Sequence, residues 1–201
     1  MVCSSDVGGG DHGYLVLGTV GTDHHPFDRL VRWIDAWALV AAPKVDCFVQ
    51  TGPARAPENA AWARSLPHDR LQELMSRAVA VVCHAGPGTI MDCRRAGLKP
   101  IVLPRRRSLG EVVDDHQLSF ARRLAGLGHV ELVQTENEFK AALDAVVDDP
   151  LTYRIDPTRD ADLSATIRRF AALAEPLLGH PGSEPRSSAR ETLPPAFGGD
   201  Q

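Results

Sequence analysis

Short apolar runs alternate along the chain with segments whose apolar residues recur at helical spacing. The apolar runs are expected to form buried strands at 14–17, 45–50, 79–83, 100–103 and 130–133. The helical spacing predicts helices from Pro26 to about Leu39 and over 69–77, 89–96, 116–125, 135–147 and 163–178. Strands that alternate with helices predict an α/β fold, with a mainly parallel sheet covered by helices on both faces.

Two glycine-containing loops directly follow predicted strands. Residues 18–22 come after the first strand, and residues 85–88 connect the strand 79–83 to the helix that begins near Thr89. In a parallel sheet, ligands bind outside the carboxyl ends of the strands, where the strand order reverses. Both loops are therefore expected at that edge, facing one ligand. A helix that begins there offers free N–H groups and the positive end of its dipole, which suit a phosphate.

Local signals mark several element ends. Thr135 and Glu138 have the spacing of a capping box at the start of a helix. Gly97 suits a left-handed helix stop, and Pro26 suits a first helical turn. Residues 54–67 contain several prolines and are expected to be a loop with a turn or a short strand near its end.

Length and composition indicate a single domain with loose ends. A chain of 201 residues has room for one domain with a real core. We interpret residues 1–13 as a flexible arm and 14–178 as the folded domain. Residues 179–201 shift to Gly, Pro, Ser and Arg and are expected to be disordered.

Charge and cysteine usage exclude some function classes. The net charge of −4 disfavours nonspecific nucleic-acid binding. The four cysteines form no CxxC pair, and Cys47 and Cys83 lie in apolar runs where a thiol is a small core hydrophobe. No signal-like opening and no run of about 18 apolar residues occurs, so we expect neither secretion by that route nor a membrane span. A reducing cytoplasm is the expected compartment.

Five short motifs occur in a set order: VLGTVGT, PFDRL, HAGPGTIMD, AGLKPIVLP and DDHQ. Together they resemble the C-terminal domain of family 28 glycosyltransferases, and more narrowly the Alg13-like and bacterial exopolysaccharide subunits that are made as that half alone. The resemblance covers about Tyr14 to Val147. It implies that 14–178 is a Rossmann-like, donor-binding domain, a single half of a GT-B fold.

The resemblance implies a function that needs a second chain. This chain would be the donor-binding, catalytic subunit of an inverting transferase that moves a sugar from a UDP-sugar to a lipid-linked acceptor in polysaccharide or glycolipid synthesis. A membrane-attached, Alg14-like subunit would bind the acceptor and bring this cytoplasmic chain to the inner face of the membrane. The alternative is a noncatalytic nucleotide-sugar-binding module that regulates a partner. An NAD-type oxidoreductase is disfavoured because GTVGT does not fit GxGxxG.

The resemblance also assigns donor binding to Gly21, Thr22, Gly86, Gly88, Thr89, Asp92, His116 and Gln117. The second glycine loop would hold the phosphates, and the first would lie opposite the diphosphate. Asp92 stands where the family usually has a glutamate on the ribose hydroxyls; a shorter carboxylate can still accept two hydrogen bonds, but with a changed reach. His116 and Gln117 match the motif that addresses sugar hydroxyls or phosphates.

No metal and no other cofactor is expected. In such a transfer the leaving UDP gains negative charge, which helix N-termini stabilise without a cation. No DxD-like pair stands at a strand end, and Asp114 and Asp115 more simply cap the following helix. The base is His24, His25 or a residue of the missing half; similar subunits have a histidine directly after the GT pair, where this chain has Asp23.

Other polar residues near these loops have simpler interpretations. His24 and His25 can also be solvated side chains, and His84 is interpreted as orienting its loop. Arg105 to Arg107 is expected to be a solvated loop face; the alternative is contact with an anionic lipid pyrophosphate or headgroup.

Overall fold

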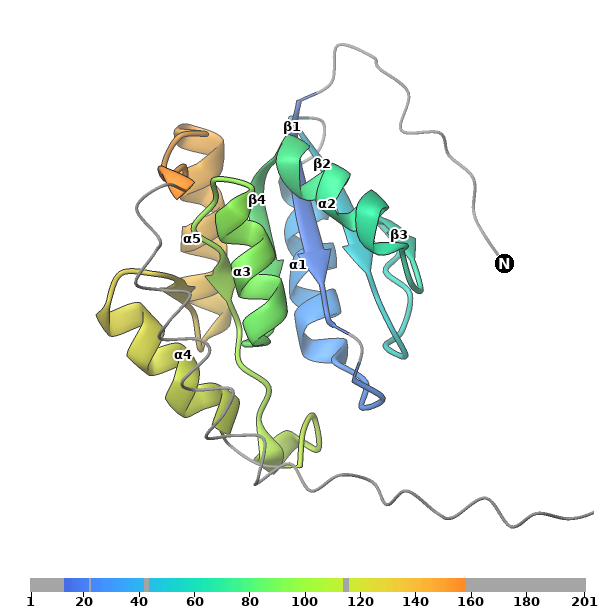
Figure 1. Ribbon diagram of the computed structural model, residues 1–201. Helices are drawn as coiled ribbons and strands as arrows, with labels where there is room; N and C mark the ends of the chain where they lie inside the picture. The colour runs from blue at the N-terminus through green and yellow to red at the C-terminus, as the bar shows by residue number, and fades with distance from the viewer. Residues whose placement is uncertain (1–12, 22, 42–43, 114–115, 158–201) are drawn as a thin grey trace, which may run out of the picture.

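The computed structural model describes residues 13–21, 23–41, 44–113 and 116–157. In this part the chain forms one six-stranded sheet whose paired strands are all parallel (Figure 1). The strands are β1 (Tyr14–Thr19), β2 (Val45–Gln50), β3 (Ala61–Ala63), β4 (Ala78–Cys83), β5 (Ile101–Val102) and β6 (Glu131–Leu132). The helices are α1 (Asp28–Ala41), α2 (His68–Arg77), α3 (Pro87–Arg95), α4 (His116–Gly126) and α5 (Glu136–Asp148), with a 3-10 turn, η1, at Arg107–Leu109.

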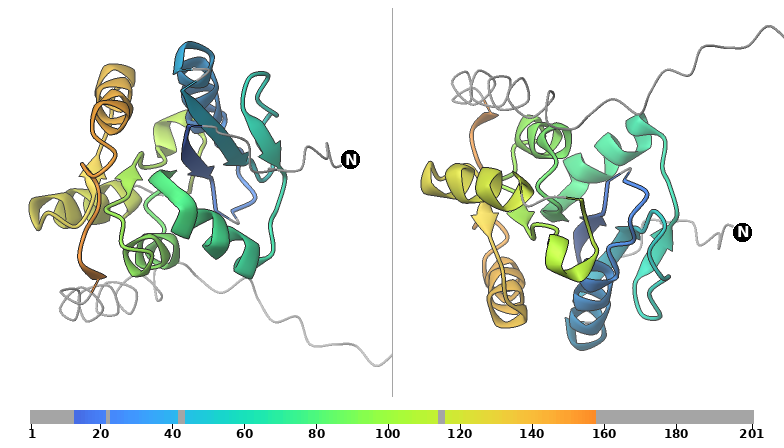
Figure 2. Two further views of the ribbon diagram at one scale, coloured as in Figure 1. Left: turned by 90° about the horizontal axis from the view of Figure 1, so that it is seen from above. Right: turned by 90° about the horizontal axis from the view of Figure 1, so that it is seen from below.

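Helices cover both faces of the sheet, as the alternating pattern predicted (Figure 2). Helices α1 and α5 pack on one face, whereas α2, α3 and α4 pack on the other. The central strand β4 shows why its sequence is a continuous apolar run. Ala80 and Val82 contribute to the α1 and α5 side, and Val81 and Cys83 contribute to the opposite side. A strand buried on both faces needs apolar residues at every position.

The strand order is β3-β2-β1-β4-β5-β6, so the direction of winding reverses between β1 and β4. These two strands are adjacent and in close register, with Leu17 opposite Val81 and Thr19 opposite Cys83. Because both strands end at the same level, the connections that follow them leave the sheet side by side. This is the switch point at which doubly wound sheets bind ligands.

Several local predictions are confirmed. Thr135 Oγ1 accepts a hydrogen bond from Glu138 N at 3.2 Å, and Glu138 Oε2 accepts one from Thr135 N at 3.1 Å, so the capping box is present. Gly97 has a φ of 77° just after α3, as expected for a left-handed stop. The short strand β3 lies near the end of the predicted loop 54–67.

Some predicted boundaries are wrong. Helix α1 begins at Asp28, so Pro26 precedes it; the Phe27 carbonyl accepts the hydrogen bond from Val31 N that opens the helix, at 3.4 Å. Helix α3 begins at Pro87. Gly18 belongs to β1, and the first loop starts at Val20. Strands β5 and β6 have only two residues each, so both are shorter than predicted.

Other sequence expectations concern residues outside the described part. The predicted helix 163–178, the arm up to residue 12 and the tail from 179 fall there. Among the described helices, none is long and apolar enough to cross a membrane. Cys47, Cys83 and Cys93 are buried free thiols, as the apolar runs around the first two predicted.

Candidate functional site

The two glycine loops meet at the switch point, where the sequence placed them. Val20 to Phe27 joins β1 to α1, and His84 to Gly86 joins β4 to α3. Val20 N donates to Gln50 O at 3.2 Å, which ties the start of the first loop to the end of β2. The right-hand view of Figure 2 looks onto the side of the molecule where the first of these loops and η1 lie.

The imidazole of His84 lies between the two glycines. A Cβ added at Gly21 would stand 2.4 Å from His84 Cε1, and one added at Gly86 would stand 2.2 Å from His84 Nε2. Gly21 also has a φ of 80°, a conformation that favours glycine. Both glycines are therefore required by packing around this ring, whether or not a ligand is bound.

The His84 side chain is an uncharged imidazole packed between the two loops, which agrees with its interpretation as a loop-orienting residue. Burial, helped by the positive charge of Arg105, lowers the pKa of His84 to about 4. Its Nδ1 atom is buried and has no hydrogen-bond partner among the described residues. The ring thus contacts both loops without carrying charge at neutral pH.

Helix α3 begins with free donors. Gly86 is its N-cap and makes no side-chain cap hydrogen bond, and Pro87 stands in its first turn. The Gly88 and Thr89 N–H groups belong to the first turn, which has no intrahelical acceptors. A Cβ at Gly88 would have no neighbour within 4 Å among the described residues, which leave the space beside this first turn open. The arrangement can bind an anion through N–H groups and the helix dipole.

Asp92 follows Gly88 by one helical turn and therefore shares its face of α3. Its side chain is 15% exposed. Its Oδ1 atom accepts from Arg95 Nη1 at 3.2 Å and from Gln72 Nε2 on α2 at 3.4 Å. Both contacts use the same oxygen, and the second is long for a hydrogen bond. The carboxylate is thus placed beside the open first turn of α3 and retains accepting capacity.

Of the remaining predicted donor-binding residues, the structure describes only some. Gln117 lies in the first turn of α4, and its Oε1 atom is buried without a hydrogen-bond partner among the described residues. A buried amide oxygen without a donor is costly, so a ligand hydroxyl or N–H would be favourable there. His116 begins α4, but its side chain is outside the described atoms. Thr22 and the two aspartates 114 and 115 are outside the described residues.

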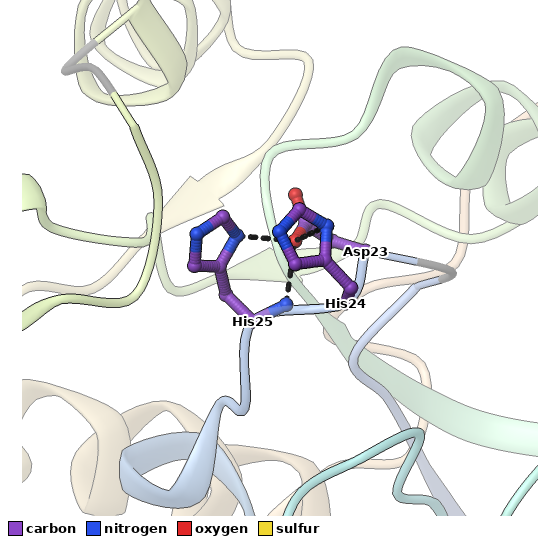
Figure 3. A group of neighbouring side chains, drawn as sticks. All are labelled: Asp23, His24 and His25. Carbon is purple, nitrogen blue, oxygen red and sulfur yellow. Dashed lines mark hydrogen bonds and ion pairs between the residues drawn. The ribbon is translucent and has the colours of Figure 1, made fainter. Parts of the chain in front are cut away.

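Asp23, His24 and His25 form a compact polar group on the first loop (Figure 3). Their ligand-type atoms lie within 4.8 Å of one another, a spacing that a single transition-metal ion would accept. However, Asp23 Oδ1 already accepts from both His25 N, at 2.8 Å, and His25 Nδ1, at 2.7 Å. The group is therefore a hydrogen-bonded pair, Asp23 and His25, with the ring of His24 beside that of His25.

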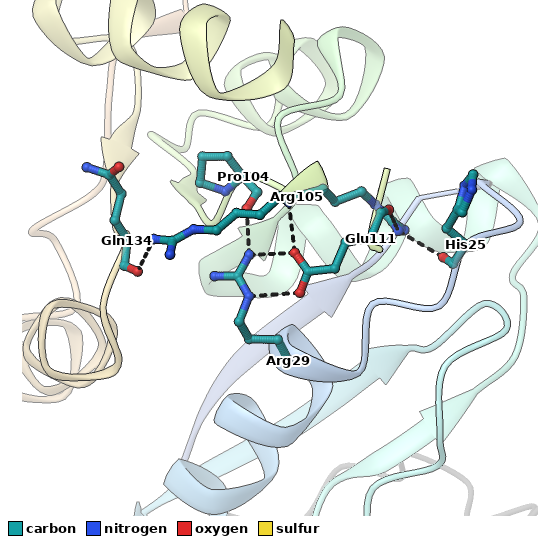
Figure 4. A network of polar contacts seen from close by, with 7 residues as sticks. His25, Arg29, Pro104, Arg105, Glu111 and Gln134 are labelled. Carbon is teal, nitrogen blue, oxygen red and sulfur yellow. Dashed lines mark hydrogen bonds and ion pairs between the residues drawn. The ribbon is translucent and has the colours of Figure 1, made fainter. Parts of the chain in front are cut away.

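Arg105 is completely buried, so the expectation of a solvated face at Arg105 to Arg107 is wrong for this residue. Its guanidinium donates to the carbonyls of Val20, His25 and Glu111 at 2.8 to 2.9 Å and lies over the Phe27 ring. Figure 4 shows its contact with His25. Burial lowers the pKa of Arg105, although the charges of Asp23 and Glu111 oppose this shift. Arg105 thus ties the loop after β1 to the loop after β5.

A second arginine supports the same junction. Arg29 of α1 forms a two-point ion pair with Glu111, at 2.8 and 2.7 Å, and also donates to the Pro104 carbonyl. Arg106 donates through Nη2 to the Gln134 carbonyl at 2.8 Å, so it too is engaged within the protein. Sequence analysis gave no role to Glu111, or to Arg29 within the PFDRL motif, because their pairing joins residues 82 positions apart.

A separate hollow of about 380 Å³ lies at the opposite edge of the sheet. It is formed by the C-terminal ends of α1 and α5, where Trp37 Nε1 donates to Asp144 Oδ1 at 2.9 Å. It contains none of the predicted site residues. We assign the site to the switch point because the open first turn of α3 and the two glycine loops lie there.

Comparison with known proteins agrees with this architecture. Solved structures with a similar fold include the glycotransferase of kitacinnamycin, at 19% identity and a TM-score of 0.53, covering 83% of this chain and 43% of that one. ALG13, solved in solution, matches at 16% identity and a TM-score of 0.51, covering 78% of this chain and 95% of that one. The spinosyn rhamnosyltransferase SpnG, complexed with thymidine diphosphate, matches at 22% identity and a TM-score of 0.50, covering 83% and 45%.

The chain therefore spans less than half the length of two of these proteins and nearly all of ALG13. No curated protein matches the chain. Its sheet is the Rossmann-like half of a GT-B fold, as the motifs predicted. Residues 19–171 match the model of the glycosyltransferase family 28 C-terminal domain, which is well over half of the 201 residues. The chain belongs to the glycosyltransferase family 28 C-terminal domain family.

Proposed function

We propose that this chain binds a UDP-sugar at the switch point and is the donor-binding, catalytic subunit of an inverting glycosyltransferase. The observation that carries the proposal is the open first turn of α3 beside the two glycine loops. A diphosphate is the group that best matches uncapped N–H donors at a helix start. Family membership then makes a nucleotide-sugar the expected source of that diphosphate.

The donor would lie across the first turns of α3 and α4. N–H groups of Gly88 and Thr89 would hold the phosphates, with Gly21, Thr22 and Gly86 forming the walls of the phosphate site. Asp92 would accept from the ribose hydroxyls, since its carboxylate shares the face of α3 that Gly88 leaves open. Gln117, with its unpartnered oxygen, and His116 would address the sugar end.

The proposed chemistry follows from charge. As the glycosidic bond breaks, negative charge grows on the β-phosphate of the leaving UDP. Fixed N–H donors at the start of α3 would stabilise that charge without having to reorganise. Loss of one such preorganised donor typically costs about 3 kcal/mol in the transition state. The transfer we propose therefore requires no metal ion.

The acceptor would be bound by a second chain. The described sheet is one half of a GT-B fold, and one half offers only one wall of a cleft. As the family resemblance implies, a membrane-attached, Alg14-like subunit would supply the other wall and present a lipid-linked acceptor on the cytoplasmic side. The donor is proposed to be a UDP-sugar because the motifs of the chain resemble subunits that use one.

Calorimetric titration of the full chain with UDP, UDP-GlcNAc, UDP-glucose and NAD tests binding. We expect a uridine nucleotide to bind, Asp92→Ala and Gln117→Ala to weaken that binding, and Asp148→Ala, at the far edge of the sheet, to leave it unchanged. UDP release is then measured with and without a membrane-attached partner. Binding without turnover in every combination would favour a noncatalytic regulatory module, and absence of any uridine-nucleotide binding would contradict the proposal.

A further inference from the structure

We propose that His25, and not His24, is the base that accepts the proton of the acceptor hydroxyl, and that Asp23 is its positioning residue. The inference rests on the proposed function and specifies it further, because the sequence left the two histidines and the missing half open. It is carried by the hydrogen bonds of the first loop.

Asp23 fixes both the position and the tautomer of His25. One carboxylate oxygen, Oδ1, accepts from His25 N at 2.8 Å and from His25 Nδ1 at 2.7 Å (Figure 3). Since a carboxylate only accepts, the Nδ1 atom must carry the proton. The Nε2 atom then has a free lone pair, which is the atom a base needs.

The charge on Asp23 is maintained at neutral pH. Burial would raise the pKa of Asp23, but the hydrogen bonds from the His25 backbone and ring, with the charge of Arg105, lower it below its usual value. An ionised aspartate also stabilises the imidazolium that forms when His25 takes a proton. Other titratable groups near this loop are His24, Arg105 and the neutral His84.

The backbone of His25 is held from the other side. Arg105 donates to the His25 carbonyl at 2.8 Å while its guanidinium lies 4.7 Å from the centroid of the Phe27 ring. The His25 side chain is 26% exposed, so it is supported by protein and still accessible. A base that must reach a proton within hydrogen-bond distance benefits from such support.

His24 lacks this support. Its side chain is 86% exposed, and its Nδ1 atom stands 3.7 Å from Asp23 Oδ1, which is too long for a hydrogen bond. Its ring lies beside that of His25, with centroids 4.0 Å apart. His24 is therefore a matched control for His25: the same side chain, one residue away, without the orienting carboxylate.

The proposed step moves one proton, forms one bond and breaks one bond. His25 Nε2 takes the proton from the acceptor hydroxyl, and the acceptor oxygen forms a bond to the anomeric carbon of the sugar. The bond from that carbon to the β-phosphate oxygen breaks, and its electron pair leaves with UDP. His25 becomes an imidazolium paired with the Asp23 carboxylate, and it later loses the proton to solvent.

The first test is the tautomer of His25 in the full chain, measured by long-range proton–nitrogen NMR above pH 7.5. We expect an Nδ1-protonated ring in the wild type and in His24→Gln, and a shift toward the Nε2-protonated form in Asp23→Ala. An Nε2-protonated His25 in the wild type would overturn the proposal. Stoichiometric zinc binding that His24→Gln and His25→Gln each abolish would also overturn it, because the group would then be a metal site.

The second test is kinetic and uses UDP release from the UDP-sugar in the presence of the partner subunit. General-base catalysis typically contributes about 10² to 10⁴-fold, so His25→Gln is expected to lower kcat by that order while the KM for the UDP-sugar stays within a few-fold. His24→Gln should retain most of the wild-type kcat. Wild-type kcat in His25→Gln would overturn this inference alone, whereas absence of turnover in the wild type with every partner would overturn the proposed function as well.

Discussion

Gly88 offers a direct way to separate folding from donor binding. It stands in the first turn of α3, and an added Cβ would meet no atom within 4 Å in the part of the chain that the structure describes. The folded protein therefore has room for alanine at this position. Any intolerance of Gly88→Ala must come from something that occupies the open space, and the proposed occupant is the diphosphate.

Gly88→Ala is expected to stabilise the folded protein and to weaken its binding of UDP. Alanine in a helix is favoured over glycine by about 0.5–1 kcal/mol, so Gly88→Ala should raise the free energy of unfolding by up to this amount. The new methyl group would displace the phosphate from charge-assisted hydrogen bonds worth about 1.5–3 kcal/mol each. Loss of one such bond corresponds to about 10- to 100-fold weaker UDP binding.

Thermal unfolding and calorimetric titration with UDP measure the two effects. Gly126→Ala is the matched control, because Gly126 is the last residue of α4 and its added Cβ would also meet no described atom within 4 Å. Both variants should be at least as stable as the wild type, and only Gly88→Ala should lose affinity. A stable Gly88→Ala variant with wild-type UDP affinity would refute the placement of the phosphate.

Three further predictions concern the structure around the site. The pKa of His84 is lowered from 6.5 to about 4 in the folded protein, so the unfolded chain takes up a proton first as the pH falls, and the free energy of unfolding should drop by about 3 kcal/mol between these two values. Urea unfolding at several pH values should show this drop in the wild type and a flatter profile in His84→Gln. Equal profiles in the two proteins would contradict the prediction. Arg105→Met removes a buried cation and the donors to three carbonyls, so it should lower the free energy of unfolding, measured in urea, by about 3–5 kcal/mol. Arg105→Lys should restore only part of this stability. A decrease of less than about 1 kcal/mol in Arg105→Met would contradict the role of Arg105 in connecting the two loops. Asp35 accepts hydrogen bonds from the backbone N–H groups of residues 58–60, so Asp35→Ala should lower the free energy of unfolding by about 1–3 kcal/mol. Substitution of the exposed Asp46 by alanine should change it little. Similar decreases in both variants would contradict a stabilising role for the Asp35 hydrogen bonds.

Sequence analysis succeeded where the information is local or periodic. The run at β4 is apolar at every position because the strand is buried on both faces, and this pattern is visible without a structure. The capping box joins Thr135 and Glu138, which are three residues apart. The edge at which the glycine loops lie follows from the parallel sheet alone, because every loop after a strand leaves from that edge.

Sequence analysis failed where a residue's role depends on distant parts of the chain. Arg105 stands in a run of three arginines, and its burial results from contacts with Val20 and His25, which are 85 and 80 positions away. Likewise, Glu111 meets Arg29 across 82 positions. The choice between His24 and His25 depends on side-chain orientation, which the adjacent pair of histidines in the sequence does not reveal.

The most direct test of the central claim is to follow the backbone amides of the full chain by proton–nitrogen NMR during titration with UDP. The account predicts that the amides of Gly21, Gly86, Gly88 and Thr89 shift together and saturate at one affinity. The Trp37 indole N–H, which donates to Asp144 at the opposite edge, should remain unchanged and serves as an internal control. Absence of shifts at the glycine loops, or shifts confined to the hollow beside Trp37, would contradict the claim that these loops form a single diphosphate site.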